Sequence, residues 1–265
     1  VNSQGLIEDM QILSGNLVTN GDFSQEGAEQ ITNGSFDTDT NWTKGTGWSI
    51  SGGSANCDGT QSANAALVQQ NGIKGAIIDF VVGKTYKVNF DIVVTSGNIT
   101  NIEVANGYDG SNITTSGNHT TYITAVSTND RLTITGNPDF TGSIDNVSVK
   151  EVGQDWTLGT GVTIGENKAI FTSTASGQSV SQNAVASSLT NGALAKVSFE
   201  VLSRTQGSFG VYFSGTLVGT LASAGVFTGY FTKGTETSFY IRALGTTSGS
   251  ISNISVIEIT EDTNL

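Results

Sequence analysis

Residues 87–94 read Lys-Val-Asn-Phe-Asp-Ile-Val-Val, and residues 196–201 read Lys-Val-Ser-Phe-Glu-Val, so that apolar and polar side chains alternate in both segments. Because successive side chains of a strand point to opposite faces, this alternation is typical of a strand with one buried and one solvated face. Further strands are expected in segments of the same kind, at residues 121–126, 131–135, 209–213, 226–232 and 239–243.

The two alternating segments belong to a longer internal repeat. The stretch Asn-Trp-Thr-Lys-Gly-Thr-Gly at 41–47 matches Asp-Trp-Thr-Leu-Gly-Thr-Gly at 155–161, an offset of 155 − 41 = 114. The repeat closes where Gly-Ser-Ile-Asp-Asn-Val-Ser-Val at 142–149 matches Gly-Ser-Ile-Ser-Asn-Ile-Ser-Val at 249–256. Two copies of one domain are the best description of the chain.

An opening motif occurs twice near the N-terminus, as Asn-Gly-Asp-Phe at 20–23 and as Asn-Gly-Ser-Phe at 33–36, and no such motif stands directly before Trp156. One copy must start the first sandwich, and the other is interpreted as a flanking strand or the remnant of a preceding repeat. We expect the chain to divide into four parts: a leader with an extra strand motif at 1–30, a first sandwich at 31–152, a second sandwich at 153–260 and a tail at 261–265.

The composition selects the fold class. Gly contributes 34 residues, charged residues make up only 13%, and no long window places apolar residues at helical spacing. Pro138 is the single proline, whereas disordered chains usually carry several prolines and lack regular apolar alternation. We therefore expect an all-β protein built as two tandem antiparallel β-sandwiches of the jelly-roll type.

Charge, the length of apolar runs and cysteine content argue against nucleic-acid binding, membrane insertion and an intrachain disulfide. The net charge is −12, and the 11 Lys and Arg residues are scattered, which argues against binding of nucleic acid. No apolar run is long enough to span a bilayer, so membrane insertion is not expected. Cys57 is the only cysteine, so an intrachain disulfide is impossible.

The sequence also argues against an enzyme. His119 is the only histidine and lies in a polar turn, so neither a Ser-His-Asp or Cys-His arrangement nor a zinc site is supported. With 23 acidic residues some carboxylate pair could always be nominated, but none stands out. We expect a non-catalytic protein.

The opening Asn-Gly-x-Phe-acid, the tryptophan a few residues later and the closing Ile-Asp-Asn-Val-Ser-Val resemble the jelly-roll carbohydrate-binding modules of bacterial glycoside hydrolases. Similar modules occur in tail-fibre and other virion surface proteins of marine bacteriophages. The resemblance covers residues 16–152 well and 153–260 more weakly. It implies a structural calcium ion in the first sandwich, held by Asp37 of the opening motif and Asp145 of the closing motif. Ser252 replaces the closing Asp in the second repeat, and the resemblance therefore gives little support to calcium there.

Sugar binding by a β-sandwich relies on exposed aromatic rings that pack against the C–H face of a pyranose. The matched Trp42 and Trp156 are instead expected to be packing residues. Tyr212 and Tyr240 are out of phase with their apolar neighbours and are expected to point outward. The candidate ligand-binding residues are Trp48, Tyr108 and Tyr122 in the first repeat and Tyr212, Tyr230 and Tyr240 in the second.

These observations favour a carbohydrate-binding or adhesion segment, located on a virion surface or outside the cell. In a phage tail fibre or surface protein its partners would be a host-surface polysaccharide or glycan and other virion chains. Two alternatives stay open. One is a purely architectural virion decoration or spacer protein. The other is an accessory module of a secreted polysaccharide-degrading enzyme.

Overall fold

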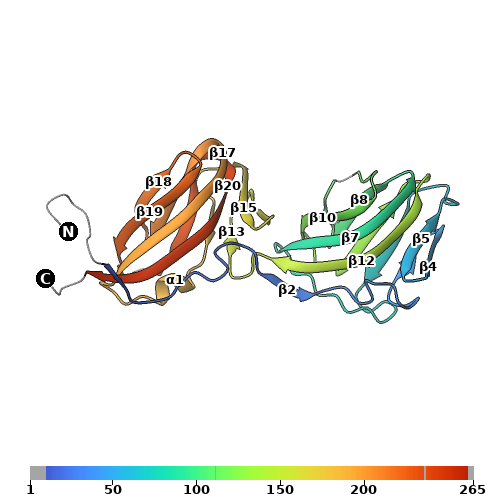
Figure 1. Ribbon diagram of the computed structural model, residues 1–265, viewed down its shortest axis with the longest axis horizontal. Coiled ribbons are helices and arrows are strands. Elements are labelled where there is room, and N and C mark those ends of the chain that lie inside the picture. The colour runs from blue at the N-terminus through green and yellow to red at the C-terminus, as the bar shows by residue number, and fades with distance from the viewer. Residues whose placement is uncertain (1–9, 111, 236, 262–265) are drawn as a thin grey trace. The chain divides into compact units, whose positions relative to one another are not determined.

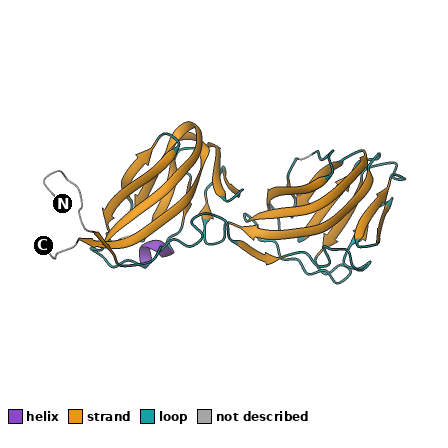
Figure 2. Ribbon diagram, in the orientation of Figure 1, coloured by secondary structure: helices purple, strands orange, loops and turns teal. Residues whose placement is uncertain are grey.

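The computed structural model describes residues 10–110, 112–235 and 237–261. Strands dominate these residues, and the one helix, α1 (Ala184–Ser187), is a single turn (Figure 2). No helix in this part of the chain is long and apolar enough to cross a membrane. The predicted all-β class is confirmed.

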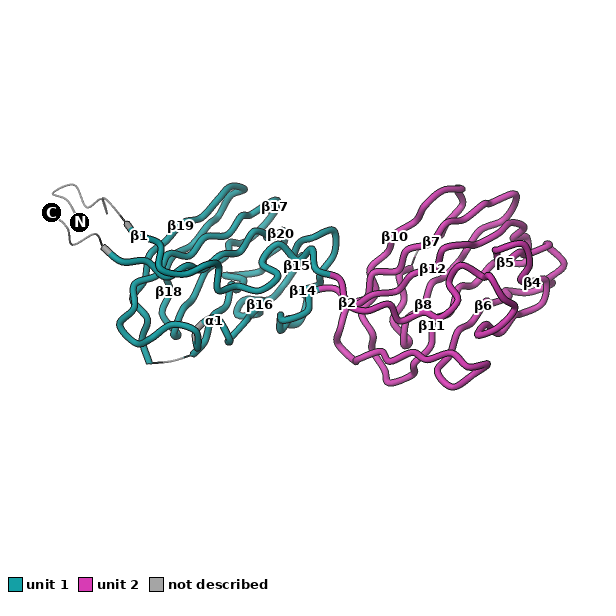
Figure 3. The backbone as a smooth tube through the Cα atoms, turned by 60° about the horizontal axis from the view of Figure 1, so that its bottom comes forward, with its two compact units in different colours: residues 1–25, 153–265 teal, residues 26–152 magenta. Residues whose placement is uncertain are grey.

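The chain divides into two compact units (Figure 3). One contains residues 26–152 and is called the first sandwich. The other contains residues 1–25 and 153–265, of which 10–25 and 153–261 are described apart from 236; it is called the second sandwich. The first sandwich is therefore inserted into the sequence of the second.

The first sandwich consists of two antiparallel sheets. Alternate residues of its two central strands, such as Val88, Phe90 and Val149, are fully buried in its core. Sheet one has the order β10 (Gly117–Thr124), β7 (Thr85–Ser96), β12 (Thr141–Val152), β5 (Ser54–Asp58) and β4 (Trp48–Ser51), with β2 (Glu26–Glu29) also paired to β12. Sheet two has the order β3 (Thr43–Lys44), β6 (Ala65–Gln70), β11 (Arg131–Gly136), β8 (Ile99–Val104) and β9 (Gly107–Tyr108).

The nine strands that the structure describes in the second sandwich form one continuous antiparallel sheet. Its two long strands, β17 (Leu194–Phe213) and β20 (Phe239–Glu261), labelled in Figure 1, pair with each other from end to end and each contribute to both layers, so that the strand order of the first sandwich is repeated. The N-terminal half of β17 and the C-terminal half of β20 correspond to β7 and β12. Their other halves correspond to β8 and β11. The remaining strands are β1 (Met10–Ile12), β13 (Thr157–Leu158), β14 (Val162–Gly165), β15 (Lys168–Thr174), β16 (Ser179–Ser181), β18 (Thr216–Leu221) and β19 (Gly225–Thr232).

The first opening motif belongs to the second sandwich, so the prediction that residues 1–30 form a separate leader is wrong for the described residues 10–25. Trp156 Nε1 donates to Asn20 O over 2.9 Å, and the Trp156 ring packs on Phe23 at 5.2 Å between centroids. The contacts of the second motif with Trp42 are the same: 2.9 Å from Nε1 to Asn33 O and 5.0 Å between the Trp42 and Phe36 centroids.

A buried glutamine side chain holds the main chain just before each opening motif in the same way. Gln182 pairs through both of its amide atoms with the main chain of Thr19, at 2.8 and 2.9 Å. Gln69 makes the same two bonds to Thr32, at 2.9 and 2.8 Å. Each motif therefore opens the sandwich whose tryptophan and glutamine hold it, although one motif is separated from its tryptophan by a whole domain. The expected packing role of Trp42 and Trp156 is confirmed, because both are buried.

Candidate functional site

The outer face of sheet two in the first sandwich carries a row of side chains across five strands. The pairing registers place them side by side in the order Tyr108, Glu103, Thr133, Val68 and Thr43. The alternate residues of β8 and β11 lie in the core, so this row faces away from it. Tyr108 is 63% exposed and stands at one end of the row, as expected for a predicted ligand-binding aromatic.

The centre of this row contains a partly buried ion pair. Arg131 Nη2 lies 2.6 Å from Glu103 Oε1, and the Glu103 side chain is only 6% exposed. Arg131 Nε and Thr133 Oγ1 are buried without a hydrogen-bond partner among the described residues. Buried polar atoms are normally paired, so these two atoms mark a place where a ligand or water could supply bonds.

A pocket of about 420 Å³ opens at the other end of the row. It is lined by residues 43–46 and 61–66 together with Val68, most of which are small or uncharged. The row thus runs from an exposed aromatic ring, past a charged centre, to a hollow lined by both polar and small apolar residues. That combination of a ring, fixed polar groups and a shallow cavity suits a sugar-sized ligand.

The equivalent face of the second sandwich carries an aromatic cluster. Here the row reads Leu217, Tyr212, Tyr240, Ser181 and Thr157 across β18, β17, β20, β16 and β13. The rings of Tyr212 and Tyr240 stack at 5.0 Å with an interplanar angle of 13°. The next residues of the row, Ser181 and Thr157, have small side chains, so they leave space beside the Tyr240 ring.

Arg242 extends this aromatic cluster. Its guanidinium carbon lies 4.1 Å from the centroid of the Tyr212 ring, and Nη2 donates to Tyr212 Oη over 2.8 Å. Arg242 Nε is buried without a partner among the described residues, as Arg131 Nε is in the first sandwich. Four polar residues of these faces were not predicted from the sequence: Glu103, Arg131, Thr133 and Arg242. Each of them alternates with buried apolar residues of its strand, and this alternation could have identified them as outward-facing.

Two of the predicted aromatic residues are less exposed than expected. Trp48 is 6% exposed, donates from Nε1 to Ala65 O over 3.1 Å and packs against Phe140, so its predicted exposure is wrong. Tyr212 leaves the core as predicted but is 8% exposed, because Tyr240 and Arg242 cover it. Tyr240 is therefore the accessible ring of that pair.

Tyr122 and Tyr230 lie on β10 and β19, in the other layer of each sandwich, and Tyr230 lines a pocket of about 300 Å³ together with Leu217 at the end of the second row. The two tyrosines are register partners of Lys87 and Lys196. Polar side chains on β10, β7 and β12, near Tyr122, already bond to one another. Asp91, for example, accepts hydrogen bonds from Asn118 and Asn146, which hold the pKa of its carboxyl below the usual value. Tyr122 thus serves as a control for the candidate faces.

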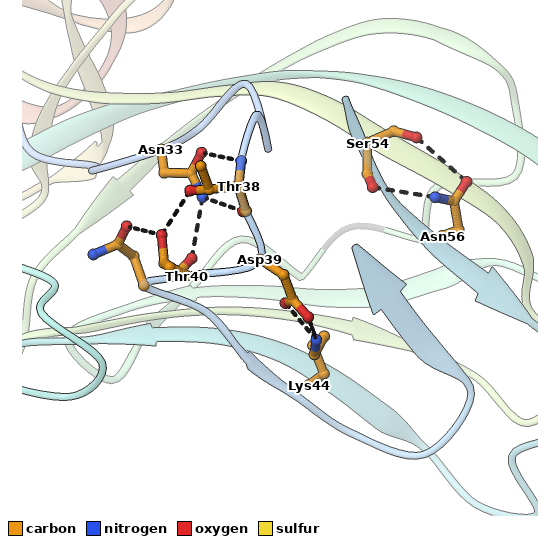
Figure 4. Close-up of polar contacts among 8 residues, drawn as sticks. Asn33, Thr38, Asp39, Thr40, Lys44, Ser54 and Asn56 are labelled. Atoms are coloured by element: carbon orange, nitrogen blue, oxygen red, sulfur yellow. Dashed lines mark hydrogen bonds and ion pairs between the residues drawn. The ribbon is translucent and has the colours of Figure 1, made fainter. Parts of the chain in front are cut away.

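The predicted calcium ligands lie at the opening and closing motifs of the first sandwich. Asp37 accepts a hydrogen bond from Ser35 Oγ at 2.8 Å, and Asp145 accepts one from Asn146 N at 2.6 Å. The loop that joins Ser35 to Lys44 is held by the side chain of Asn33, which donates hydrogen bonds to the carbonyls of Thr38 and Thr40 (Figure 4). No three His, Cys, Asp or Glu side chains cluster within the described residues, so a cation here would take most ligands from main-chain or hydroxyl oxygens.

Cys57 and His119 make structural contacts. Cys57 is buried on β5 and donates to Gln61 Oε1, and burial raises the pKa of its thiol. His119 lies on β10, where Nε2 is 2.9 Å from Thr115 O and the ring stacks on Phe90.

No protein-family model and no curated protein matches the chain. Among solved structures, it is similar to the tandem CBM22 modules of Xyn10C from Paenibacillus barcinonensis, at 10% identity and a TM-score of 0.34 over 92% of this chain and 100% of that one. It is also similar to the tandem CBM51 modules of a family 98 glycoside hydrolase from Streptococcus pneumoniae, at 6% identity, TM-score 0.26 and coverages of 95% and 99%. A triple jelly-roll turret protein of an archaeal virus matches at 12% identity and TM-score 0.24, over 91% and 60%. Scores this low assign no ligand to the chain.

Proposed function

We propose that the chain is a non-catalytic carbohydrate-binding protein that uses the outer face of the same layer in each sandwich. The observation that carries this proposal is the pair of register-equivalent rows, each of which has an accessible tyrosine, Tyr108 or Tyr240, on the same face as an arginine whose Nε has no partner among the described residues. Tyrosine rings supply apolar contact with sugar C–H groups, and fixed donors orient the hydroxyls.

We further propose that the setting is a virion surface or another extracellular structure, in which the two sandwiches present their faces to host-surface glycans and the chain contacts other virion proteins. The duplicated, acidic and Gly-rich sequence supports this proposal. A gene placed among genes for tail or capsid proteins is the expected finding. A polysaccharide-degrading catalytic domain encoded in the same polypeptide would contradict the virion setting.

A glycan screen with single variants tests the binding faces. Replacement of Tyr108 or Tyr240 by Ala is expected to weaken binding by about 1–2 kcal/mol, that is roughly five- to thirty-fold, because each removes the ring that packs on the sugar. Titration calorimetry with the best glycan from the screen measures the loss.

The control variants are Tyr122→Ala and Lys196→Met, which change one residue in the other layer of each sandwich. They are expected to leave the affinity unchanged. Equal losses in both pairs of variants, or no saturable binding to any glycan, would reject the proposed faces.

We also propose that the first sandwich binds calcium at Asp145. At the matching position of the second sandwich, the Ser252 hydroxyl lies 2.9 Å from Asn167 O and 3.3 Å from Asp22 O. The main chain takes the same course in both, since Val147 N donates to Gly34 O and Ile254 N to Gly21 O, each at 2.9 Å. The Ser252 hydroxyl can donate a hydrogen bond to these carbonyl oxygens, whereas the Asp145 carboxylate of the first sandwich cannot donate one. A carboxylate that faces main-chain carbonyl oxygens favours a bound cation, to which both kinds of oxygen can be ligands.

Chelation tests the calcium proposal. Removal of calcium with EDTA is expected to lower the melting temperature of the first sandwich by several degrees, because an ion bound only by the native state stabilises it by mass action. Re-addition of calcium should restore the transition, and Asp145→Ser should abolish the effect. An unchanged transition after dialysis against EDTA would remove the ion from the account.

A further inference from the structure

Arg242 is a cation without a carboxylate partner. It forms no ion pair within the described residues, although the whole chain carries a net charge of −12. Within the part of the chain that the structure describes, the one hydrogen bond of Arg242 goes to Tyr212 Oη, and most of the five guanidinium donors have no partner there. The equivalent face of the first sandwich differs, because there Glu103 neutralises Arg131.

The surroundings of Arg242 are uncharged. Its register partners on the neighbouring strands are Gly210 and Ser179, and the Tyr212 ring lies over Gly210. The position that Glu103 occupies in the first sandwich is taken by Tyr212, so the duplicated face has an aromatic ring where its counterpart has a carboxylate.

A guanidinium held against aromatic rings is fixed in orientation and partly removed from water, which strengthens its interaction with an anion. Its planar donors match the geometry of a carboxylate or sulfate group. We infer that the face of the second sandwich binds acidic saccharides, with Arg242 contacting the carboxylate or sulfate and Tyr240 packing on the sugar ring. This inference rests on the proposed carbohydrate binding and specifies its ligand class.

Matched pairs of charged and neutralised polysaccharides test the inference with the full chain. Polygalacturonate and its methyl ester form the carboxylate arm, and carrageenan and desulfated carrageenan form the sulfate arm. The charged member of at least one pair is expected to bind ten-fold or more tightly. That preference should disappear in Arg242→Met and persist in Lys196→Met, a control that removes a positive charge from the other layer of the same sandwich.

A salt titration of the unaltered protein provides a readout that does not depend on the folding of a variant. Binding of the charged polysaccharide should weaken steeply between low and high sodium chloride, whereas binding of the neutral member should not. Absence of a charge preference in every pair would overturn the inference. If Tyr240-dependent binding to neutral glycans remained in that case, the proposed function would stand; if no glycan bound, both would fall.

Discussion

A chain that begins at Glu26 is expected to lose the second sandwich while the first sandwich stays folded. The deletion removes Phe23 and Val18, which are 1% and 6% exposed in the second core. Loss of a buried Phe alone costs about 3–5 kcal/mol, a large part of the roughly 5–15 kcal/mol that stabilises a typical domain. It also removes the Asn20 acceptor of Trp156 Nε1 and the Thr19 partners of both Gln182 amide atoms, of which Nε2 keeps only its 3.4 Å contact with Asp155 O.

Calorimetry measures this outcome directly. The full chain should show two unfolding transitions and the shortened chain one. The matched substitutions Trp156→Ala and Trp42→Ala should each lower a different transition, since each tryptophan holds the opening motif of its own sandwich. Two unchanged transitions in the shortened chain would show that residues 10–25 are dispensable for the second sandwich.

Replacement of Arg131 by Met is expected to destabilise the first sandwich by about 3 kcal/mol. The substitution leaves the Glu103 carboxylate, whose side chain is 6% exposed, without its counter-ion. Breaking a buried pair costs about 3–5 kcal/mol, and the lower end applies because the Arg131 side chain is one-third exposed. Denaturant unfolding monitored in the first sandwich measures the change.

Two further variants separate this effect from general loss of charge. Lys87→Met removes one of the two lysine partners of Glu26 on the other sheet, where both side chains are about one-third exposed, and should cost less than about 1 kcal/mol. The double variant Glu103→Gln with Arg131→Met should recover much of the lost stability, because no unpaired charge then remains buried. A cost for Arg131→Met no larger than that for Lys87→Met would contradict the buried character of the pair.

Period-two alternation was sufficient to predict the fold. Residues 87–94 lie in β7, residues 131–135 lie in β11, and the two repeated copies form two antiparallel sandwiches of the same topology. The assignment of the opening motifs required three-dimensional information. In the sequence, the motif at 20–23 precedes the first sandwich, and only its contacts with Trp156 and Gln182 show which domain it completes.

The candidate site was only partly predictable for a similar reason. Tyr108 and Tyr240 could be selected from their phase and surroundings, and the phase of Trp48 with Ile50 could have marked it as buried. The accessible surface of Tyr212, however, depends on Tyr240 and Arg242, which come from another strand. Cross-strand register decides such neighbours, and a single sequence does not specify it.

The central claim is that equivalent faces of the two sandwiches bind carbohydrate. Calorimetric titration of the full chain and of the double variant Tyr108→Ala with Tyr240→Ala tests it most directly, using the best glycan from the screen and the double variant Tyr122→Ala with Lys196→Met as control. The account predicts saturable binding that the first double variant abolishes and the control retains. Undiminished binding by a folded Tyr108→Ala, Tyr240→Ala protein would contradict it.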